Sequence, residues 1–600
     1  MAQFVMDPPT NGQRRQHVIV CGLAGIGVRV VEQFHLSGTD VVVIDEKGGE
    51  RYDRLLSAWG VKFIRASAHA GEGFVDAGID HALAVVCVER DDVRTLETAL
   101  RVHELRPEIR LVVQLANPSV AGALSRVTGS DSVLDAASLA APSFVEICLR
   151  QPVHDVQLDE TQFYVVQTEV AETFDRHDTF RAHFGDLAPV AVIPSNGEPL
   201  VQCPGRDHVV RPHDRVAVLG TREELLHYAI DIAQLTHQPV RRLGHLRRIS
   251  RQVTTMISEG NQALAFIAAG LAALIVLSTI ILRFGYRAHD VHHHLSYLSA
   301  LYFTVETIAT VGFGDYSFAV QNAWMKVFAI VMIASGVALL STAFALFTNL
   351  LVSRRIEQSL GRLEVPGMVD HVVVIGLGSV GIAVVRGLVD EGQRVVVIER
   401  DANNRYLAQA RALGVPVLVA DATQRQTHGM VNLGDAASVA VLTSDDLTNI
   451  ETALAIRESL GERWEQVPVA VRVFDRDLAR MMERSFGFRN VRSTSALAAP
   501  WFVGAALGLD ILSTFYVDQQ PFLVGKVSIS PSGGLQGLSM ADLSARTRVI
   551  GLRRASDPAT LEHPPRRGTR FMGGDQAFVL GPYEEILNLL HHEQTERSLG

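Results

Sequence analysis

Two long stretches without a charged residue stand near the middle of the chain, Ala263–Leu282 and Val327–Leu351. A helix rises about 1.5 Å per residue, so roughly 20 residues cross the ~30 Å hydrocarbon core of a bilayer. The alternative for each stretch is a buried helix of a soluble protein. It is disfavoured because the two stretches bracket a glycine-rich strip. We therefore predict two membrane-spanning helices, over residues 263–283 and 323–352.

The regions on both sides of these stretches alternate between short apolar runs and amphipathic segments. The N-terminal region predicts a strand, a glycine-rich turn, a helix and a second strand ending in an acid. They lie at His17–Val20, Gly22–Gly27, Val28–Leu36, Val41–Ile44 and Asp45. This order is typical of dinucleotide-binding domains. Further apolar runs at 83–88, 111–114 and 132–134 predict a parallel, doubly wound sheet.

The same order recurs on the C-terminal side of the membrane region. Its members are the strand His371–Ile375, the turn Gly376–Gly381, the strand Val395–Ile398 and the acid Glu399. The spacing from His17 to His371 equals that from Asp45 to Glu399. A constant offset of this kind indicates a duplicated domain.

The chain is therefore predicted to be multidomain. Two α/β Rossmann-like domains, each with a small α+β C-terminal lobe, flank an all-α two-helix pore-loop membrane domain. The predicted boundaries are a disordered tail (1–16), a first Rossmann lobe (17–150) and its C-lobe (151–235), a basic linker (236–262), the pore domain (263–352) with a pore helix (296–309) and a filter (310–315), a gating linker (353–369), a second Rossmann lobe (370–505) and its C-lobe (506–600).

Charge and cysteine content change this picture in three ways. The formal net charge of −10 gives no nucleic-acid-binding footprint. The four cysteines have no metal-ligand spacing, and reduced thiols are expected. Arginines cluster at 241–251 before the first membrane stretch and at 354–362 after the second, which marks both ends as cytosolic. We predict a multi-pass protein of the cell membrane, in contact with lipid, with both termini and both Rossmann-like domains in the cytoplasm.

The strip between the two membrane stretches is Thr310-Val311-Gly312-Phe313-Gly314-Asp315. Glycine adopts positive φ at no steric cost, so alternating glycines let successive carbonyl groups point the same way. Copies of such a strip around an axis would stack rings of carbonyl oxygen that replace the hydration shell of K⁺. A surface turn is the alternative interpretation, and the apolar flanks disfavour it.

This strip, with Thr304–Ala309 before it, resembles the selectivity filter and pore helix of tetrameric potassium channels, with Phe313 where Tyr is commonest. Together with the two Rossmann-like units, the chain resembles a two-transmembrane bacterial potassium channel with two RCK (regulator of potassium conductance) domains per subunit. The resemblance implies a homotetramer with eight RCK domains in a ring and K⁺ bound at Thr310, Val311, Gly312 and Phe313. It also implies filter support from Glu306 and Tyr302, with Glu306 paired to Asp315.

The second Rossmann-like copy is predicted to bind a nucleotide. Its glycine turn and the following helix start favour a phosphate, and Glu399 can accept from ribose hydroxyls while repelling a 2′-phosphate. The resemblance adds the residues around Asp421 near the adenine, and a later arginine could reach a phosphate. The candidate residues are Gly376, Gly378, Ser379, Val380, Gly381, Glu399, Arg400, Asp421, Ala422, Thr423 and Arg472.

The first copy departs from this pattern. Ala24 replaces the middle glycine, Ser67 stands where Asp421 stands, and Gln114 stands where Arg472 stands. Its candidate residues are Gly22, Gly25, Ile26, Gly27 and Asp45. A different ligand, weak binding and a purely structural role remain alternatives for this copy, because a fold does not by itself imply a function.

The resulting hypothesis is a ligand-gated potassium channel without catalytic residues, regulated by NAD(H) or by ATP/ADP. One rival is a regulated subunit of a potassium uptake transporter, which a single filter per chain disfavours. Another is an NAD-dependent enzyme, which lacks a catalytic partner beside the glycine turns. The sequence leaves open which nucleotide binds and whether it opens or closes the pore.

Overall fold

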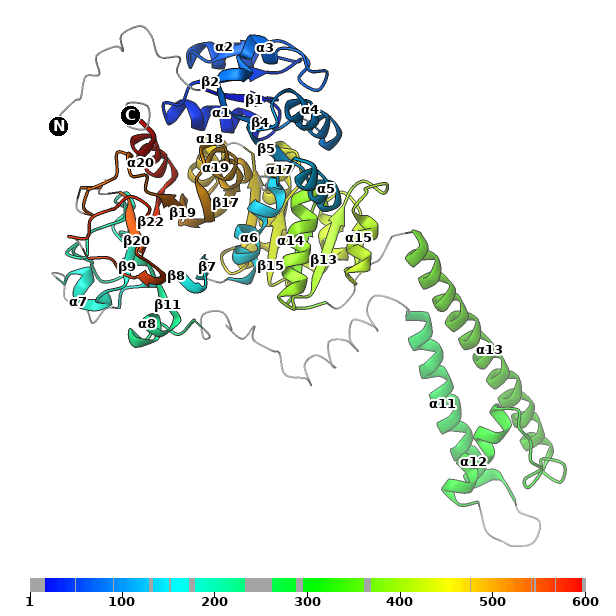
Figure 1. The fold of residues 1–600 in the computed structure, drawn as a ribbon. Coiled ribbons are helices and arrows are strands. Elements are labelled where there is room, and N and C mark those ends of the chain that lie inside the picture. Colours follow the sequence, from blue (N-terminus) through cyan, green and yellow to red (C-terminus); the bar gives the residue numbers. More distant parts are fainter. Residues whose placement is uncertain are drawn as a thin grey trace. The chain divides into compact units, whose positions relative to one another are not determined.

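The computed structural model divides the chain into two compact units, a soluble unit built from both ends of the chain and a helical unit from its middle. Figure 1 shows the elements of each unit. The structure describes residues 17–595 except 49, 90, 129–132, 151–152, 172–177, 233–261, 288–294, 361–367, 475, 541, 544–545 and 567. The predicted tail (1–16), nearly all of the predicted basic linker and part of the predicted gating linker therefore lie outside the described residues.

The first sheet of the soluble unit has six parallel strands in the order β3-β2-β1-β4-β5-β6. They are β1 (His17–Cys21), β2 (Val41–Ile44), β3 (Lys62–Ile64), β4 (Ala82–Cys87), β5 (Arg110–Gln114) and β6 (Val133–Leu134). The helices between them are α1 (Gly27–Leu36), α2 (Glu50–Ala58), α3 (Phe74–Ala77), α4 (Asp92–Leu105) and α5 (Pro118–Thr128). The central strands are buried along most of their length, which explains their unbroken apolar sequences.

The second sheet repeats this order as β14-β13-β12-β15-β16-β17. Its strands are β12 (Val372–Ile375), β13 (Val395–Glu399), β14 (Val417–Val419), β15 (Ser438–Val441), β16 (Val469–Val473) and β17 (Asn490–Ser493). Its helices are α14 (Ser379–Asp390), α15 (Leu407–Ala412), α16 (Arg425–Met430), α17 (Asp446–Leu460) and α18 (Arg476–Phe486). Both sheets are Rossmann-like, which confirms the predicted duplication.

One helix of each copy packs on the other copy. Helix α6 (Ala136–Leu149) follows the first sheet but lies against α14 and the second sheet. Helix α19 (Thr494–Leu507) follows the second sheet but lies against α1 and the first sheet. Both helices are apolar on nearly every face, and such a helix has to be buried on all sides. The exchange joins the two copies into one unit, and the sequence did not indicate it.

Each copy ends in a lobe built on a five-stranded antiparallel sheet. The strand orders are β10-β9-β11-β8-β7 and β18-β19-β22-β20-β21. The first lobe contains β7 (Val153–Leu158), β8 (Thr161–Glu169), β9 (Ala188–Ile193), β10 (Val201–Gln202), β11 (Arg215–Thr221), α7 (Phe180–Phe184) and α8 (Arg222–His227). The second contains β18 (Asp510–Val517), β19 (Gln520–Ser528), β20 (Arg548–Arg554), β21 (Asp557–Glu562), β22 (Gln576–Pro582) and α20 (Tyr583–Thr595). A shared core that includes Phe163, Phe515 and Phe578 joins the two sheets.

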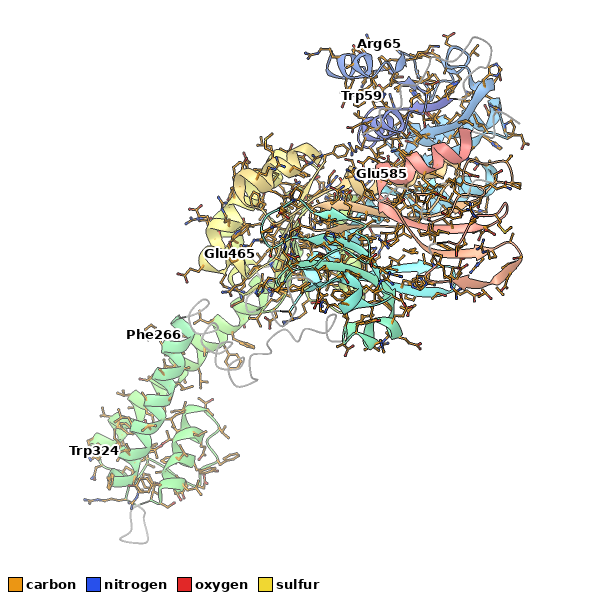
Figure 2. All side chains as sticks on the ribbon, turned by 90° about the vertical axis from the view of Figure 1, so that its left-hand side faces the viewer. Trp59, Arg65, Phe266, Trp324, Glu465 and Glu585 are labelled. Carbon is orange, nitrogen blue, oxygen red and sulfur yellow. The ribbon has the colours of Figure 1, made fainter. Side chains whose placement is uncertain are left out.

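The helical unit consists of α11 (Gln262–Gly285), α12 (Tyr297–Ile308) and α13 (Ala323–Leu360). Two segments are long and apolar enough to cross a membrane, Phe266–Gly285 and Ala323–Thr348. Phe266 and Trp324, labelled in Figure 2, are 74% and 54% exposed in the single chain. Helix α13 continues to Leu360, into the range that we predicted as the gating linker.

Candidate functional site

The strip after α12 has the backbone alternation that its glycines predict. The φ values of Thr310, Gly312 and Gly314 are 58°, 59° and 87°, whereas Val311 and Phe313 do not have positive φ. Alternation between left-handed and ordinary conformations turns successive carbonyl groups toward one side, in contrast to a strand. Thr310 is a β-branched residue in the left-handed region, where such residues are rare.

Glu306 links the pore helix to this strip. The side chain is buried, and one carboxylate oxygen accepts a hydrogen bond from the Phe313 backbone N–H. The backbone carbonyl of Glu306 accepts from the Val311 N–H at 3.0 Å. The other carboxylate oxygen is buried and has no hydrogen-bond partner among the described residues. The expected pairing of Glu306 with Asp315 stays a prediction, and Tyr302 lies half-exposed beside Asp315.

A second set of contacts holds the segment after the strip, and the sequence did not indicate it. The Tyr286 hydroxyl donates to the Ser317 carbonyl at 3.0 Å and accepts from the Ser317 N–H at 3.1 Å. Gln321 accepts from the Arg287 N–H at 3.2 Å and donates to the Arg287 carbonyl at 2.8 Å. These paired bonds tie the end of α11 to the segment between the strip and α13.

The glycine turn of the second copy has the geometry of a dinucleotide loop. Gly376 has φ 92°, and a Cβ there would lie 2.8 Å from the Thr443 nitrogen. A Cβ on Gly381 would lie 2.1 Å from the Gly376 carbonyl oxygen. Gly378 faces open space, and α14 begins at the next residue, Ser379. Two glycines are thus required for close packing, and the third leaves room at the start of a helix, where backbone amides favour an anion.

The predicted acidic residues of this copy surround the same loop. Glu399 accepts from the Leu377 N–H at 2.7 Å and from the Asp401 N–H at 2.9 Å, and its oxygens retain lone pairs for a ribose. Asp421 accepts from the backbone N–H and the hydroxyl of Thr423, and these bonds lower its pKa. Arg472, on β16, donates to the Thr443 carbonyl at 3.3 Å, and burial lowers its pKa. Ala422 is buried, and Val380 lies in the core beneath the loop.

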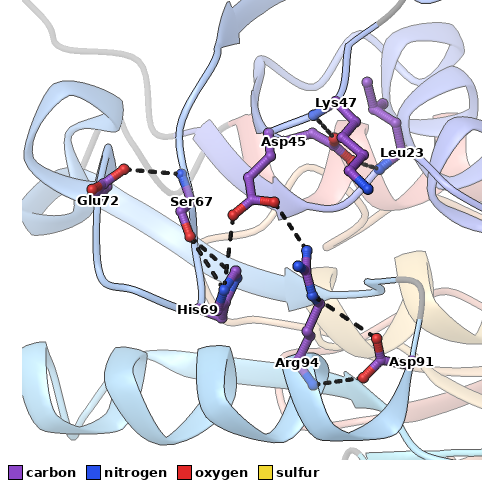
Figure 3. Close-up of polar contacts among 9 residues, drawn as sticks. Leu23, Asp45, Lys47, Ser67, His69, Glu72, Asp91 and Arg94 are labelled. Atoms are coloured by element: carbon purple, nitrogen blue, oxygen red, sulfur yellow. Dashed lines mark hydrogen bonds and ion pairs between the residues drawn. The ribbon is translucent and has the colours of Figure 1, made fainter.

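The first copy repeats the acid but not the open mouth. Asp45 accepts from the Leu23 and Lys47 N–H groups, each at 2.7 Å, as Glu399 does in the second copy. Across the mouth, Arg94 donates to Glu46 at 3.0 Å, and His69 lies 3.8 Å from the same carboxylate. Figure 3 shows Asp45, His69 and Arg94 in this region. Sequence reasoning did not identify Glu46, His69 or Arg94. The signal was available in the duplication, because Glu46 occupies the position of Arg400.

Comparison with known proteins agrees with this description. Residues 18–135 and 372–494 match the model of the TrkA-N domain, and residues 269–353 match that of an ion channel. The matched ranges together cover more than half of the chain. The calcium-gated potassium channel TvoK of Thermoplasma volcanium is 24% identical over 48% of this chain and 82% of its own length. Probable potassium channel protein 2 of Methanocaldococcus jannaschii is 21% identical over 53% and 94%.

Two further matches are more distant or shorter. An uncharacterized protein of Methanothermus fervidus is 24% identical over 28% of this chain, which spans about a quarter (27%) of that relative. The solved structure of the GsuK channel bound to NAD aligns over 98% of this chain and 80% of that chain, with 14% identity and a TM-score of 0.47.

The fold and the strip define a membrane ion channel that carries nucleotide-binding-type regulatory domains. Its TrkA-N domains lie on both sides of the pore domain in the sequence. The chain belongs to the potassium channels with TrkA-N (RCK) domains.

Proposed function

We propose that four copies of this chain form one K⁺-selective pore in the cell membrane, and that a nucleotide bound to the cytosolic second TrkA-N domain sets its opening. The alternating backbone of Thr310, Gly312 and Gly314 carries this proposal. It presents a row of carbonyl oxygens that can coordinate dehydrated K⁺ once several copies surround an axis. The boundaries and site residues predicted from the sequence are part of this proposal.

Exposure within a single chain supports the tetramer. Val311 and Phe313 are 51% and 73% exposed, although the strip lies between two apolar helices. One strip cannot enclose an ion, and closed rotational symmetry is the usual way to complete such a site. In a tetramer, neighbouring subunits would cover these side chains and complete the carbonyl rings.

The second glycine loop supports a nucleotide as the ligand. Gly378 leaves open space at the start of α14, and Glu399 stands at the end of the next strand. This arrangement fits a pyrophosphate on the helix start and a ribose on the carboxylate. Solved structures of the GsuK channel have been obtained with NAD and with ADP. We propose an adenine nucleotide of this kind for the present chain.

Basic residues fix the proposed orientation. Arginines precede the first membrane helix and follow the second, so both helix ends face the cytosol and the strip faces the outer side. Both TrkA-N domains then lie in the compartment that contains nucleotides.

The test is reconstitution of the purified full chain in planar bilayers, with ADP or NAD⁺ added to the cytosolic face. We expect single-channel currents selective for K⁺ over Na⁺, with an open probability that changes with one of these nucleotides. Equal permeation of Na⁺ and K⁺ would disprove the assignment of the strip. K⁺ currents unaffected by either nucleotide would disprove the assignment of the ligand and leave the pore intact.

A further inference from the structure

The residues around the two glycine turns differ in charge at equivalent positions. The residue after the acid that ends the second strand is Glu46 in the first copy and Arg400 in the second. A second difference lies in the first turn of the helix that follows the fourth strand of each copy, where α4 has Arg94 and α17 has Thr448. A nucleotide with two or more phosphates is anionic, so these differences in charge affect which cleft can bind a nucleotide.

In the first copy, the ion pair of Glu46 and Arg94 spans the cleft. Glu46 follows β2, and Arg94 lies on α4, which follows β4. Strand β1 lies between β2 and β4 in the sheet, so the 3.0 Å ion pair passes over the carboxyl end of β1. This is the crevice in which a dinucleotide crosses a Rossmann sheet. Ser67 and Arg94 lower the pKa of Glu46 by hydrogen bonding, so its carboxylate is ionised at neutral pH.

The backbone of the first glycine turn also differs. Helix α1 begins at Gly27, whereas α14 begins at Ser379, two positions earlier in the equivalent sequence. Gly25, which stands where Ser379 stands, is in the left-handed region with φ 57°. Ala24 adds a methyl group where Gly378 leaves open space. In the first copy the helix start, and with it the amides that would hold a phosphate, is therefore displaced by two residues along the chain.

The second cleft is arranged differently at the same places. Arg400 is exposed at the mouth, close enough to Asp421 and Asp445 for its positive charge to assist the hydrogen bonds that lower their pKa values. The Thr448 hydroxyl, in the position of Arg94, donates to Asp445 at 2.6 Å. Because Asp445 caps α17, this contact stays on one side of the cleft.

We propose that each subunit binds one adenine nucleotide with a pyrophosphate group, and binds it in the second cleft only. The charge at the equivalent positions Glu46 and Arg400 determines which cleft binds the nucleotide. In the first cleft, the internal ion pair occupies the ligand crevice and the Glu46 carboxylate repels phosphate. In the second cleft, Arg400 provides the cation for an adenine nucleotide that carries a pyrophosphate. This inference rests on the proposed nucleotide gating and extends it to a stoichiometry and a specificity-determining residue.

The experiment measures equilibrium binding of radiolabelled ADP and, separately, NAD⁺ to the purified full-length channel. Wild type is compared with Arg400→Glu, with Glu46→Ala and with Arg411→Glu, a charge reversal at an exposed position of α15. Thermal melting of each variant confirms folding, which an exposed substitution should preserve. Loss of a charge-assisted hydrogen bond to phosphate, with repulsion added, predicts at least about a tenfold weaker Kd for Arg400→Glu.

We expect one bound nucleotide per subunit in wild type, strong loss in Arg400→Glu, and wild-type affinity and stoichiometry in Arg411→Glu. Glu46→Ala removes both the ion pair and the repelling carboxylate, so a second, weaker nucleotide site per subunit should appear, and its absence would overturn the charge as the deciding feature. Two nucleotides per subunit in wild type, or unchanged binding in Arg400→Glu, would overturn this inference and leave nucleotide gating standing. Wild-type protein that binds neither ADP nor NAD⁺ would overturn the proposed ligand and this inference together.

Discussion

The glycine loop of the second copy allows stability and ligand binding to be separated by two alanine substitutions three residues apart. A Cβ on Gly381 would lie 2.1 Å from the Gly376 carbonyl oxygen, whereas a Cβ on Gly378 would meet nothing within 4 Å. Ordinary contacts of a Cβ begin at 3.4 Å. Gly381→Ala must therefore move backbone by about 1.3 Å to reach an ordinary contact, and we expect a cost at or above the upper end of the ~1–3 kcal/mol typical of overpacking.

Gly378→Ala should leave stability nearly unchanged. The residue has φ −78°, which alanine adopts readily, and the smaller entropy of the unfolded chain offsets the weaker helix start to within about 1 kcal/mol. Its methyl group, however, points into the space where a phosphate would approach the loop. We expect an affinity for ADP or NAD⁺ at least about tenfold lower, which corresponds to about 1.4 kcal/mol.

Differential scanning fluorimetry and equilibrium nucleotide binding on the full-length channel distinguish the two effects. The two copies and their lobes form one unit of more than 400 residues, and its large unfolding entropy means that a cost of 3 kcal/mol should lower the melting temperature of Gly381→Ala by about 3 °C. A Gly381→Ala protein that melts with wild type would refute the packing argument. Unchanged binding by Gly378→Ala would show that no ligand approaches that residue.

Three further predictions concern other parts of the chain. Burial raises the pKa of Glu483 from 4.5 to about 7, so the folded state retains this proton and stability falls as pH rises from 4.5 to 7. Glu483→Gln should remove this pH dependence and raise the free energy of unfolding at pH 8 by about 1 kcal/mol in denaturant titrations, after allowance for partial solvent screening. An unchanged pH profile would show that Glu483 is not the group responsible. A Cβ on Gly336 would lie 3.1–3.4 Å from the Ile308 side chain, so Gly336→Ala should destabilise the packing of α13 on α12 by about 1–3 kcal/mol in thermal melts, and adding Ile308→Ala should recover part of the loss. Tyr286→Phe removes both hydrogen bonds to the segment after the strip, and single-channel recording at low external K⁺ should show shorter conducting periods than in wild type or in the control Tyr297→Phe.

The sequence was sufficient where a local pattern determines the structure. Glycine spacing predicted the strip and the second nucleotide loop, because positive φ and close backbone contacts restrict those positions to glycine almost regardless of context. The constant offset between Asp45 and Glu399 predicted the duplication, and the two six-stranded sheets confirm it. These inferences required patterns in the sequence and no knowledge of which distant residues touch.

The sequence was insufficient where contacts join distant residues. The ion pair of Glu46 and Arg94 joins positions on either side of β1, and nothing near either residue predicts its partner. The exchange of α6 and α19 was missed for the same reason, since an apolar helix indicates burial but not which sheet it covers. The pairing of Tyr286 with the segment after the strip likewise depends on how α11 packs beside α12.

The helix exchange bears on how a single nucleotide per subunit could act on both regulatory domains. Helix α14 begins at the second glycine loop and packs along α6, and a Cβ on Gly387 of α14 would lie 3.0 Å from the Val145 side chain of α6. Helix α6 belongs in sequence to the first copy, so a ligand that shifts α14 displaces an element of the first domain directly.

Such a ligand changes the open–closed equilibrium only by its differential affinity for the two states. In the proposed tetramer, a tenfold difference per site multiplied over four subunits in a concerted transition gives about 5.5 kcal/mol, enough to take the pore from mostly closed to mostly open. On this proposal, one nucleotide-binding cleft per subunit is energetically sufficient, and the first copy needs no ligand of its own for gating.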